Sequence, residues 1–287
     1  MTAPAPLSRR AAVEGLGTAA LVTVVVGSGI QATELTHDVG TQLLADSLAT
    51  VFGLGVLIAL LGPVSGAHFN PAVTLAAWFT GRRTGDGPGP REVAAYVPAQ
   101  VAGAIAGAVL ADAMFGRPPA ELSTHDRFAA HLWLGEAVAT AGLVWLVFGL
   151  TRAGRAHLAA PLVASYIGAA YWFTSSTSFA NPAVTIGRMF TDSFAGIAPA
   201  SVPPFLAAQL VGAAAGLGLV AVTFGRPGAA DARPRGAGRR AAVPVVSPGE
   251  VPALSPEEAP ALSPEEVPAP SPEEAPAPST DESALTR

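Results

Sequence analysis

The chain has 287 residues, of which 50% are hydrophobic and only 13% are charged, a balance that excludes an ordinary soluble domain and indicates a membrane protein. It contains no cysteine, which excludes disulfides, thiolate metal sites and cysteine nucleophiles. The net charge of −5 combines basic flanks of apolar segments with an acidic tail, so it indicates no charged partner, and we expect no nucleic-acid partner.

Six apolar segments are long enough to cross a bilayer, which takes roughly 20 helical residues. The first follows a short N-terminal segment, 1–10, with a basic flank typical of a signal peptide. It carries Glu14 and has no convincing cleavage site, so we expect it to be retained as a span. The six predicted spans are residues 11–31, 42–61, 92–114, 131–150, 157–174 and 203–224.

Two similar phrases interrupt this apolar pattern, "GAHFNPAVTLAAWF" at 66–79 and "SFANPAVTIGRMF" at 178–190. They lie between the second and third spans and between the fifth and sixth, and each apolar stretch after them is too short to cross the membrane. Asparagine is a preferred helix cap, and proline fits the first helical turn because its missing N–H would be unpaired there. Each phrase therefore predicts a loop that enters a short half-helix.

The two halves of the chain repeat the same order of motifs: E-x-x-x-T, then NPAVT, then A-Q-x-x-G. Because each half holds three spans, the second half inserts upside down, as an inverted repeat about an axis in the membrane plane. This predicts an all-α membrane protein with six transmembrane helices and two re-entrant half-helices that meet near the middle. The repeated residues are Glu14, Thr18, Asn70, Pro71, Ala72, Gln100 and Gly103 in repeat one (11–114) and Glu136, Thr140, Asn181, Pro182, Ala183, Gln209 and Gly212 in repeat two (131–226).

This geometry predicts a path for neutral solutes. Non-helical backbone at membrane depth is tolerated only inside protein or beside a watery cavity, so we expect the loops before Asn70 and Asn181 to line a pore. Their carbonyls can accept hydrogen bonds and the two amides can donate them to a solute. Two helix N-termini aimed at one point each place roughly half a positive charge there, which repels cations and protons.

The paired NPA motifs, the "SGAHFNPAVTLA" context and the repeated glutamates and glutamines resemble the aquaporin and aquaglyceroporin (major intrinsic protein) family. The resemblance covers about residues 11–226. It implies a right-handed helical bundle, a homotetramer with one pore in each protomer, and passive conduction of water or small uncharged solutes. No cofactor is implied.

The chain departs from this family at the selectivity filter. In most members an arginine follows the second NPA motif, whereas this chain has Val184. Arg188 comes one helical turn later, and we do not assume that it replaces the missing arginine. The departure makes the predicted constriction wider and less polar than a water-only filter.

The other filter positions follow from their distance to the NPA motifs. Spacing predicts Ala169 on the fifth span and Ser178 in the loop, and on the second span either Thr50 or Phe52, depending on the length of the following loop. With Val184, this pattern resembles a bacterial subgroup often linked to arsenic resistance. We therefore predict a channel for metalloid hydroxides such as arsenous acid, for glycerol, and for water.

For several polar residues near the motifs, the sequence leaves two possible roles open. Glu14 and Glu136 are expected to bind the loop backbones, although a proton relay would make the protein a proton-coupled secondary transporter. His68 either lines the cytoplasmic side of the pore or fills a packed loop. Gln100 and Gln209 either hold loop carbonyls or pack helices. Because no His, Asp and Glu cluster has ligand spacing, we expect no metal site.

Arginines predict the topology. Most lie in the segments that the positive-inside rule assigns to the cytoplasm, so we expect both termini there and the chain in the inner (plasma) membrane. After residue 226 the composition changes to an arginine cluster and eight-residue Pro/Glu repeats. This segment, 227–287, is predicted to be a disordered, solvated spacer, or a weak regulator whose acidic repeats compete with lipid headgroups for the arginines.

Overall fold

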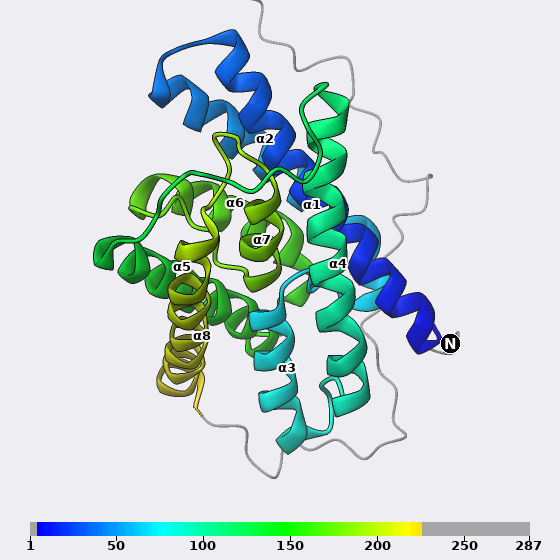
Figure 1. Ribbon diagram of the computed structural model, residues 1–287. Coiled ribbons are helices and arrows are strands. Elements are labelled where there is room, and N and C mark those ends of the chain that lie inside the picture. The colour runs from blue at the N-terminus through cyan, green and yellow to red at the C-terminus, as the bar shows by residue number, and fades with distance from the viewer. Residues whose placement is uncertain (1–4, 226–287) are drawn as a thin grey trace, which may run out of the picture. The chain divides into compact units, whose positions relative to one another are not determined.

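In the computed structural model, residues 5–225 are described, apart from the side chains of residues 83 and 84, and all their regular structure is helical (Figure 1). The predicted tail, 227–287, and residues 1–4 lie outside the described residues. The helices are α1 (Leu7–Leu35), α2 (Val39–Ser65), α3 (Pro71–Thr84), α4 (Pro90–Met114), α5 (Ala130–Arg152), α6 (Ala159–Phe173), α7 (Pro182–Gly187) and α8 (Val202–Phe224), with 3-10 turns η1 (Ala156–Leu158), η2 (Arg188–Phe190) and η3 (Pro199–Ser201).

Five of the described helices are long and apolar enough to cross a membrane: α1, α2, α4, α5 and α8, the last counted together with η3. The fifth predicted span, 157–174, is shorter than expected, because α6 has only 15 residues and is preceded by η1. The long helices extend beyond the predicted spans, since hydropathy marks the hydrocarbon core while the helix continues past it. The two shortest α-helices, α3 and α7, are the predicted half-helices.

The helix pairs α1/α4 and α5/α8 approach closely at glycines in equivalent positions of the two repeats. A Cβ on Gly103 would lie 2.1 Å from the carbonyl oxygen of Gly15, and one on Gly212 would lie 2.4 Å from that of Ala137. Small residues allow such close contact between helices in lipid, where the hydrophobic effect does not drive association. The same packing therefore builds both repeats.

The half-helices α3 and α7 occupy the space between these two pairs (Figure 1). Each of them contacts α4 from the first repeat and α8 from the second. Figure 1 shows α7 near the centre of the described helices and α3 below it, with α4 to one side and α5 and α8 to the other. The first turns of both short helices, 71–74 and 182–185, are buried in protein. Backbone that leaves a helix at membrane depth requires such cover.

Candidate solute pathway

Asn70 and Asn181 start the half-helices in the same way. Each side-chain Oδ1 accepts hydrogen bonds from the backbone N–H groups two and three residues later, at 2.9 and 3.4 Å for Asn70 and at 3.0 and 3.3 Å for Asn181. Pro71 and Pro182 occupy the first helical position, where no N–H is needed. The caps satisfy two of the free donors at each helix start.

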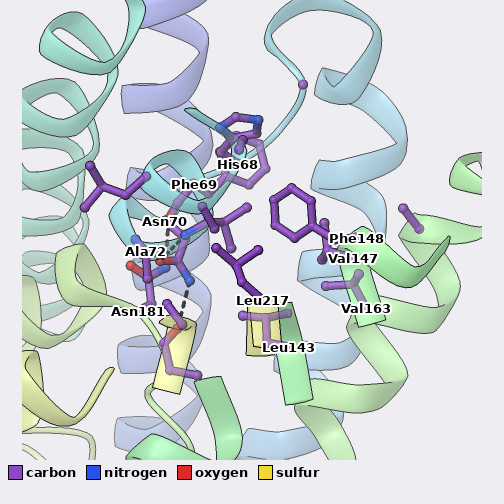
Figure 2. A pocket seen from close by; sticks show the side chains of 18 of the residues that line it. His68, Phe69, Asn70, Ala72, Leu143, Val147, Phe148, Val163, Asn181 and Leu217 are labelled. Atoms are coloured by element: carbon purple, nitrogen blue, oxygen red, sulfur yellow. Dashed lines mark hydrogen bonds between the residues drawn. The ribbon is translucent and has the colours of Figure 1, made fainter. Parts of the chain in front are cut away.

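The two asparagines also join the repeats to each other. Asn70 Nδ2 donates to the carbonyl oxygen of Ala180 at 2.8 Å, and Asn181 Nδ2 donates to that of Phe69 at 2.7 Å (Figure 2). An amide group carries two hydrogens, so each asparagine keeps one donor beyond this contact. The predicted amides therefore serve first as a bridge between the loops and only with their second hydrogen as donors to a solute.

The loops before the asparagines have matching backbone conformations. Three residues and one residue before each asparagine, φ is positive: 48° at both Ala67 and Phe69, 53° at Ser178 and 47° at Ala180. Residues other than glycine rarely adopt this conformation, which costs on the order of 1–3 kcal/mol at each position. The matching φ angles indicate that the surrounding contacts hold both loops in the same backbone conformation.

These turns leave carbonyl oxygens free. The carbonyls of Gly66, Ala67 and His68 accept no hydrogen bond from other described residues, and neither do those of Ser178 and Phe179. All five residues line a cavity between the described helices. Their oxygens can accept hydrogen bonds from hydroxyl groups that pass through.

Glu14 holds the first loop in place with both of its carboxylate oxygens. Oε1 accepts from Ser65 Oγ at 2.6 Å and from the backbone N–H of His68 at 3.0 Å. Oε2 accepts from the N–H of Phe69 at 2.6 Å and from Gln100 Nε2 at 2.8 Å. The fully buried carboxylate is thereby saturated with donors, as a charge inside a protein requires.

Glu136 does the same for the second loop. It accepts from the backbone N–H groups of Phe179 and Ala180, both at 2.8 Å, and from Gln209 Nε2 at 2.6 Å. Neither this carboxylate nor Glu14 lines the cavity bounded by the described residues. No cluster of His, Asp and Glu side chains that could hold a metal ion occurs within residues 5–225 either.

Of the two sequence interpretations of the glutamines, the structure agrees with helix packing, since both side chains are fully buried between helices. Instead of holding loop carbonyls, Gln100 donates to Glu14 and to Thr74 Oγ1 at 3.0 Å, and Gln209 donates to Glu136 and to the equivalent hydroxyl of Thr185 at 2.8 Å. A glutamine amide can bridge the two acceptors because it has two hydrogens. Each glutamine therefore connects a glutamate to the half-helix that this glutamate positions.

A cavity of about 1380 Å³ runs along both half-helices (Figure 2). Asn70 and Asn181 lie on one side of the view, with Phe148, Val163 and Leu217 across from them. One wall is thus polar and the other apolar, an arrangement typical of sites that bind small molecules with few hydrogen-bonding groups. Of the last residues of the two motifs, Ala72 lines this cavity, and both Ala72 and Ala183 are fully buried.

The profile of the major intrinsic protein family matches residues 2–178. The aquaglyceroporin AqpS of Rhizobium meliloti (strain 1021) is 51% identical over 215 residues, which cover 75% of this chain and 89% of AqpS. The chain belongs to the major intrinsic protein family. It is a multi-pass membrane channel for small neutral solutes and no enzyme.

Two further comparisons extend this similarity. The propanediol uptake facilitator PduF of Citrobacter freundii is 32% identical over 154 residues, covering 45% of this chain and 55% of PduF. The X-ray structure of the aquaglyceroporin from Plasmodium falciparum matches with a TM-score of 0.54 and 18% identity, over 75% of this chain and 94% of that chain. The latter supports the fold alone, and the predicted all-α architecture is confirmed.

On α2 of this major intrinsic protein, Thr50 and not Phe52 faces the cavity. Thr50 is 2% exposed and its Oγ1 lies 3.1 Å from the hydroxyl oxygen of Tyr171, whereas Phe52 is 69% exposed on the outer surface. Two residues along a helix differ by about 200° in direction, so only one of the pair can face inward. The structure therefore excludes Phe52 from the cavity wall, and the filter role of Thr50 stays a prediction.

The same rotation corrects the prediction on α6. Ala169 is exposed and does not line the cavity, whereas Tyr171 is buried and does, together with Ile167 and Val163 one and two turns earlier. The sequence analysis missed Tyr171. A useful signal was the four-residue spacing of Val163, Ile167 and Tyr171, which places the three on one helix face.

The remaining predicted filter residues, Ser178 and Val184, both line the cavity. The Oγ atom of Ser178 is buried and has no hydrogen-bond partner among the described residues, so it is free to bind a solute. Val184 is 5% exposed. Arg188, which we did not assume to take part, lines the same cavity.

His68 lines the cavity on the side of α3. Its Nδ1 lies 3.1 Å from Thr74 Oγ1, and its ring packs edge-on against Tyr96, with centroids 5.8 Å apart. The residue therefore both lines the cavity and packs within its loop, so the two sequence interpretations coexist.

The segment that follows α7 is fastened to the loop between α4 and α5. Asp192 accepts hydrogen bonds from the backbone N–H and hydroxyl of Thr124 at 2.8 and 3.0 Å, and the backbone bond above all lowers the pKa of this carboxyl. Arg117 donates to the carbonyl oxygen of Asp192 at 2.6 Å. These contacts hold the cavity wall near Arg188 in place.

Proposed function

We propose that this channel passively conducts uncharged polyhydroxylated solutes larger than water, with arsenous acid and glycerol as its characteristic cargo and water beside them. The single observation that carries the proposal is Val184, an apolar side chain on the cavity wall where the family resemblance predicts an arginine. A shorter, uncharged residue leaves a wider passage. The names of the relatives AqpS, an aquaglyceroporin, and PduF, a propanediol uptake facilitator, agree with small hydroxylated cargo.

Hydrogen-bonding groups along the cavity suit such molecules. Arsenous acid, As(OH)3, is neutral at physiological pH and resembles glycerol in size and in its three hydroxyl groups. The free Ser178 hydroxyl and the loop carbonyls offer hydrogen-bonding groups on the side of the re-entrant loops, and the paired hydroxyls of Thr50 and Tyr171 add two more on α2 and α6. Apolar residues on the other side leave no partner for a fully hydrated ion.

Passive flow is favoured over proton coupling because both glutamates are already occupied. Glu14 accepts four hydrogen bonds and Glu136 accepts three, and neither side chain lines the cavity formed by residues 5–225. A proton relay needs a carboxylate that exchanges protons along the path. These two instead form part of the loop scaffold.

We further propose a homotetramer in the inner (plasma) membrane with both termini in the cytoplasm, as the arginine distribution predicts. Large apolar side chains every fourth residue along α2 give this helix an exposed stripe that lipid or a neighbouring protomer would cover. The stripe consists of Leu44, Leu48, Phe52, Val56 and Leu60.

The test is arsenous acid uptake into proteoliposomes, measured beside stopped-flow water and glycerol permeability. We expect rapid, gradient-independent arsenous acid flux in the wild type. In Val184→Arg we expect this flux to fall about tenfold or more while water flux persists, because the added side chain narrows the passage. Val184→Leu is the matched control, which changes side-chain shape without adding charge or reach, and it should retain most of the flux.

Two results would contradict the proposal. If only water crosses the membrane in the wild type, the channel is not a solute facilitator. If Val184→Arg leaves arsenous acid flux unchanged, residue 184 does not set the width of the path.

A further inference from the structure

Arg188 lies on the cavity wall one helical turn after Val184. Residues four apart share a helix face, so Arg188 follows Val184 along the path at a distance of about 6 Å. The arginine is 3% exposed, and its Cζ atom lies 3.5 Å from the centre of the Phe179 ring. This stacking fixes the plane of the guanidinium group.

The backbone turns at this point because α7 is short. Gly187 packs directly against α4, where a Cβ would lie 2.6 Å from the carbonyl carbon and oxygen of Ala104. The chain then continues as the 3-10 turn η2, which begins with Arg188. The close contact with α4 therefore sets where the arginine leaves the helix.

Most donors of Arg188 have no protein partner. Its Nε atom donates to the carbonyl oxygen of Ala195, and the structure of residues 5–225 shows no other hydrogen bond from this side chain. A guanidinium group has five N–H donors, so the two terminal nitrogens retain theirs. Since the residue lines the cavity, these donors are available to a solute.

Two polar groups accompany the arginine. Tyr171 lines the same cavity as Arg188, and its hydroxyl is paired with that of Thr50. Asp46 is bound to Ser28 at 2.9 Å and makes no direct ion pair with Arg188 within the described residues. Among residues 5–225, no acidic side chain forms an ion pair with Arg188.

We propose that Arg188 supplies the positive charge of the outer constriction and, together with Thr50 and Tyr171, forms a subsite that binds neutral hydroxylated solutes and rejects cations. Width and charge are then separate properties of this path: Val184 sets the width, and Arg188 sets the charge one turn further out. The inference deepens the proposed function, since it rests on a path for neutral solutes, and it names a residue that determines specificity.

Urea and guanidinium test this directly, because they have similar planar shapes and differ in charge. Both permeabilities are measured in the same proteoliposomes that carry arsenous acid. In the wild type we expect urea to enter and guanidinium to be excluded. In Arg188→Gln we expect the guanidinium-to-urea permeability ratio to rise about tenfold or more, while Arg188→Lys, which keeps the charge, should preserve the exclusion.

Arg127 provides a matched control. Its Nε donates to the carbonyl of Gly196 at 2.9 Å, and its Cζ lies 5.1 Å from the same Phe179 ring, but it does not line the cavity. Arg127→Gln should therefore leave the permeability ratio unchanged. An equal rise in both glutamine variants would show that loss of loop structure, and not of a pore charge, causes the effect, and would overturn the proposal.

The proposal is also overturned if Arg188→Gln conducts urea with an unchanged ratio, or if the wild type conducts guanidinium as readily as urea. The second result needs no variant, so the test stands even if Arg188→Gln does not fold. Arg188→Met, which keeps the length of the side chain over the ring, replaces it in that case. If urea enters, guanidinium is excluded and the ratio rises in Arg188→Gln, but no arsenous acid flux is found, the result supports Arg188 and contradicts only the cargo.

Discussion

The two re-entrant segments have the same backbone shape up to their NPA motifs and different lengths of helix after them. Both loops have positive φ angles at the same distances from the asparagine, and both are bound by a glutamate. Counted from the proline of each motif, α3 has 14 residues, whereas α7 has only six. The symmetric part lies where the repeats meet, and the differences lie toward the two exits.

This difference separates two tasks. His68 in the first loop and Phe179 in the second precede their asparagines by the same two residues, yet the histidine contacts Thr74 and the phenyl ring stacks under Arg188. Arg188 lines the cavity directly after the end of α7, at the position that Ala77 holds within the longer α3. The unequal exits thus place different side chains on the path, and we expect them to determine which solutes pass.

The largest expected effect comes from the glutamates, which test whether the two loops are equally supported. Glu14→Ala and Glu136→Ala each leave two buried backbone N–H groups without acceptors, at a cost on the order of 3–5 kcal/mol. For a chain of this size we expect the thermal midpoint of the detergent-solubilised protein to fall by about 10 °C in either variant.

Glu34→Ala is the control for this pair, because Glu34 lies exposed on the same helix as Glu14 and should change the midpoint little. If the thermal midpoint falls in one glutamate variant by less than a third of its fall in the other, one loop depends on different contacts. The symmetric description of the centre would then be wrong.

A smaller effect is expected from the glycine that ends α7. Gly187→Ala adds a methyl group against the backbone of Ala104 and should cost about 1–3 kcal/mol and reduce arsenous acid flux, because α7 must move away from α4. The equivalent residue in α3 is Ala76, so Ala76→Gly is the reciprocal change, with an expected cost of about 1 kcal/mol. A Gly187→Ala variant with wild-type midpoint and flux would contradict the contact that places Arg188.

The smallest effect concerns the two threonines of the NPAVT motifs. Thr74→Val and Thr185→Val keep side-chain shape but remove the hydroxyl that accepts from Gln100 or Gln209, at a cost of about 1 kcal/mol each. Only Thr74 also contacts His68, so we expect glycerol permeability to change more in Thr74→Val than in Thr185→Val. Equal permeabilities would show that His68 does not depend on this contact.

Local signals explain what the sequence could predict. The caps, the first-turn prolines and the order of the repeated motifs are encoded within a few residues, and the half-helices and their glutamates followed from them. The contact of Asn70 with Ala180 joins residues 110 positions apart and has no local pattern. It emerged only from the structure.

The filter shows where such reasoning fails. Counting back from Asn181 selected Ala169, but the motif does not determine where α6 ends, and a slip of two residues turns the selected side chain by about 200°. Tyr171 took the place on the cavity wall. The position of Arg188 depends on the contact of Gly187 with α4, which is tertiary and therefore invisible in a single sequence.

The crossed asparagine bonds also have a consequence for biosynthesis. The first loop is translated about 110 residues before its partner, which at roughly 5–20 residues per second is an interval on the order of ten seconds. Throughout it, the Nδ2 group of Asn70 lacks the carbonyl of Ala180 that it later binds. During synthesis the first half therefore lacks the partner loop that completes its hydrogen bonds. In a chain truncated between the repeats, this partner never forms.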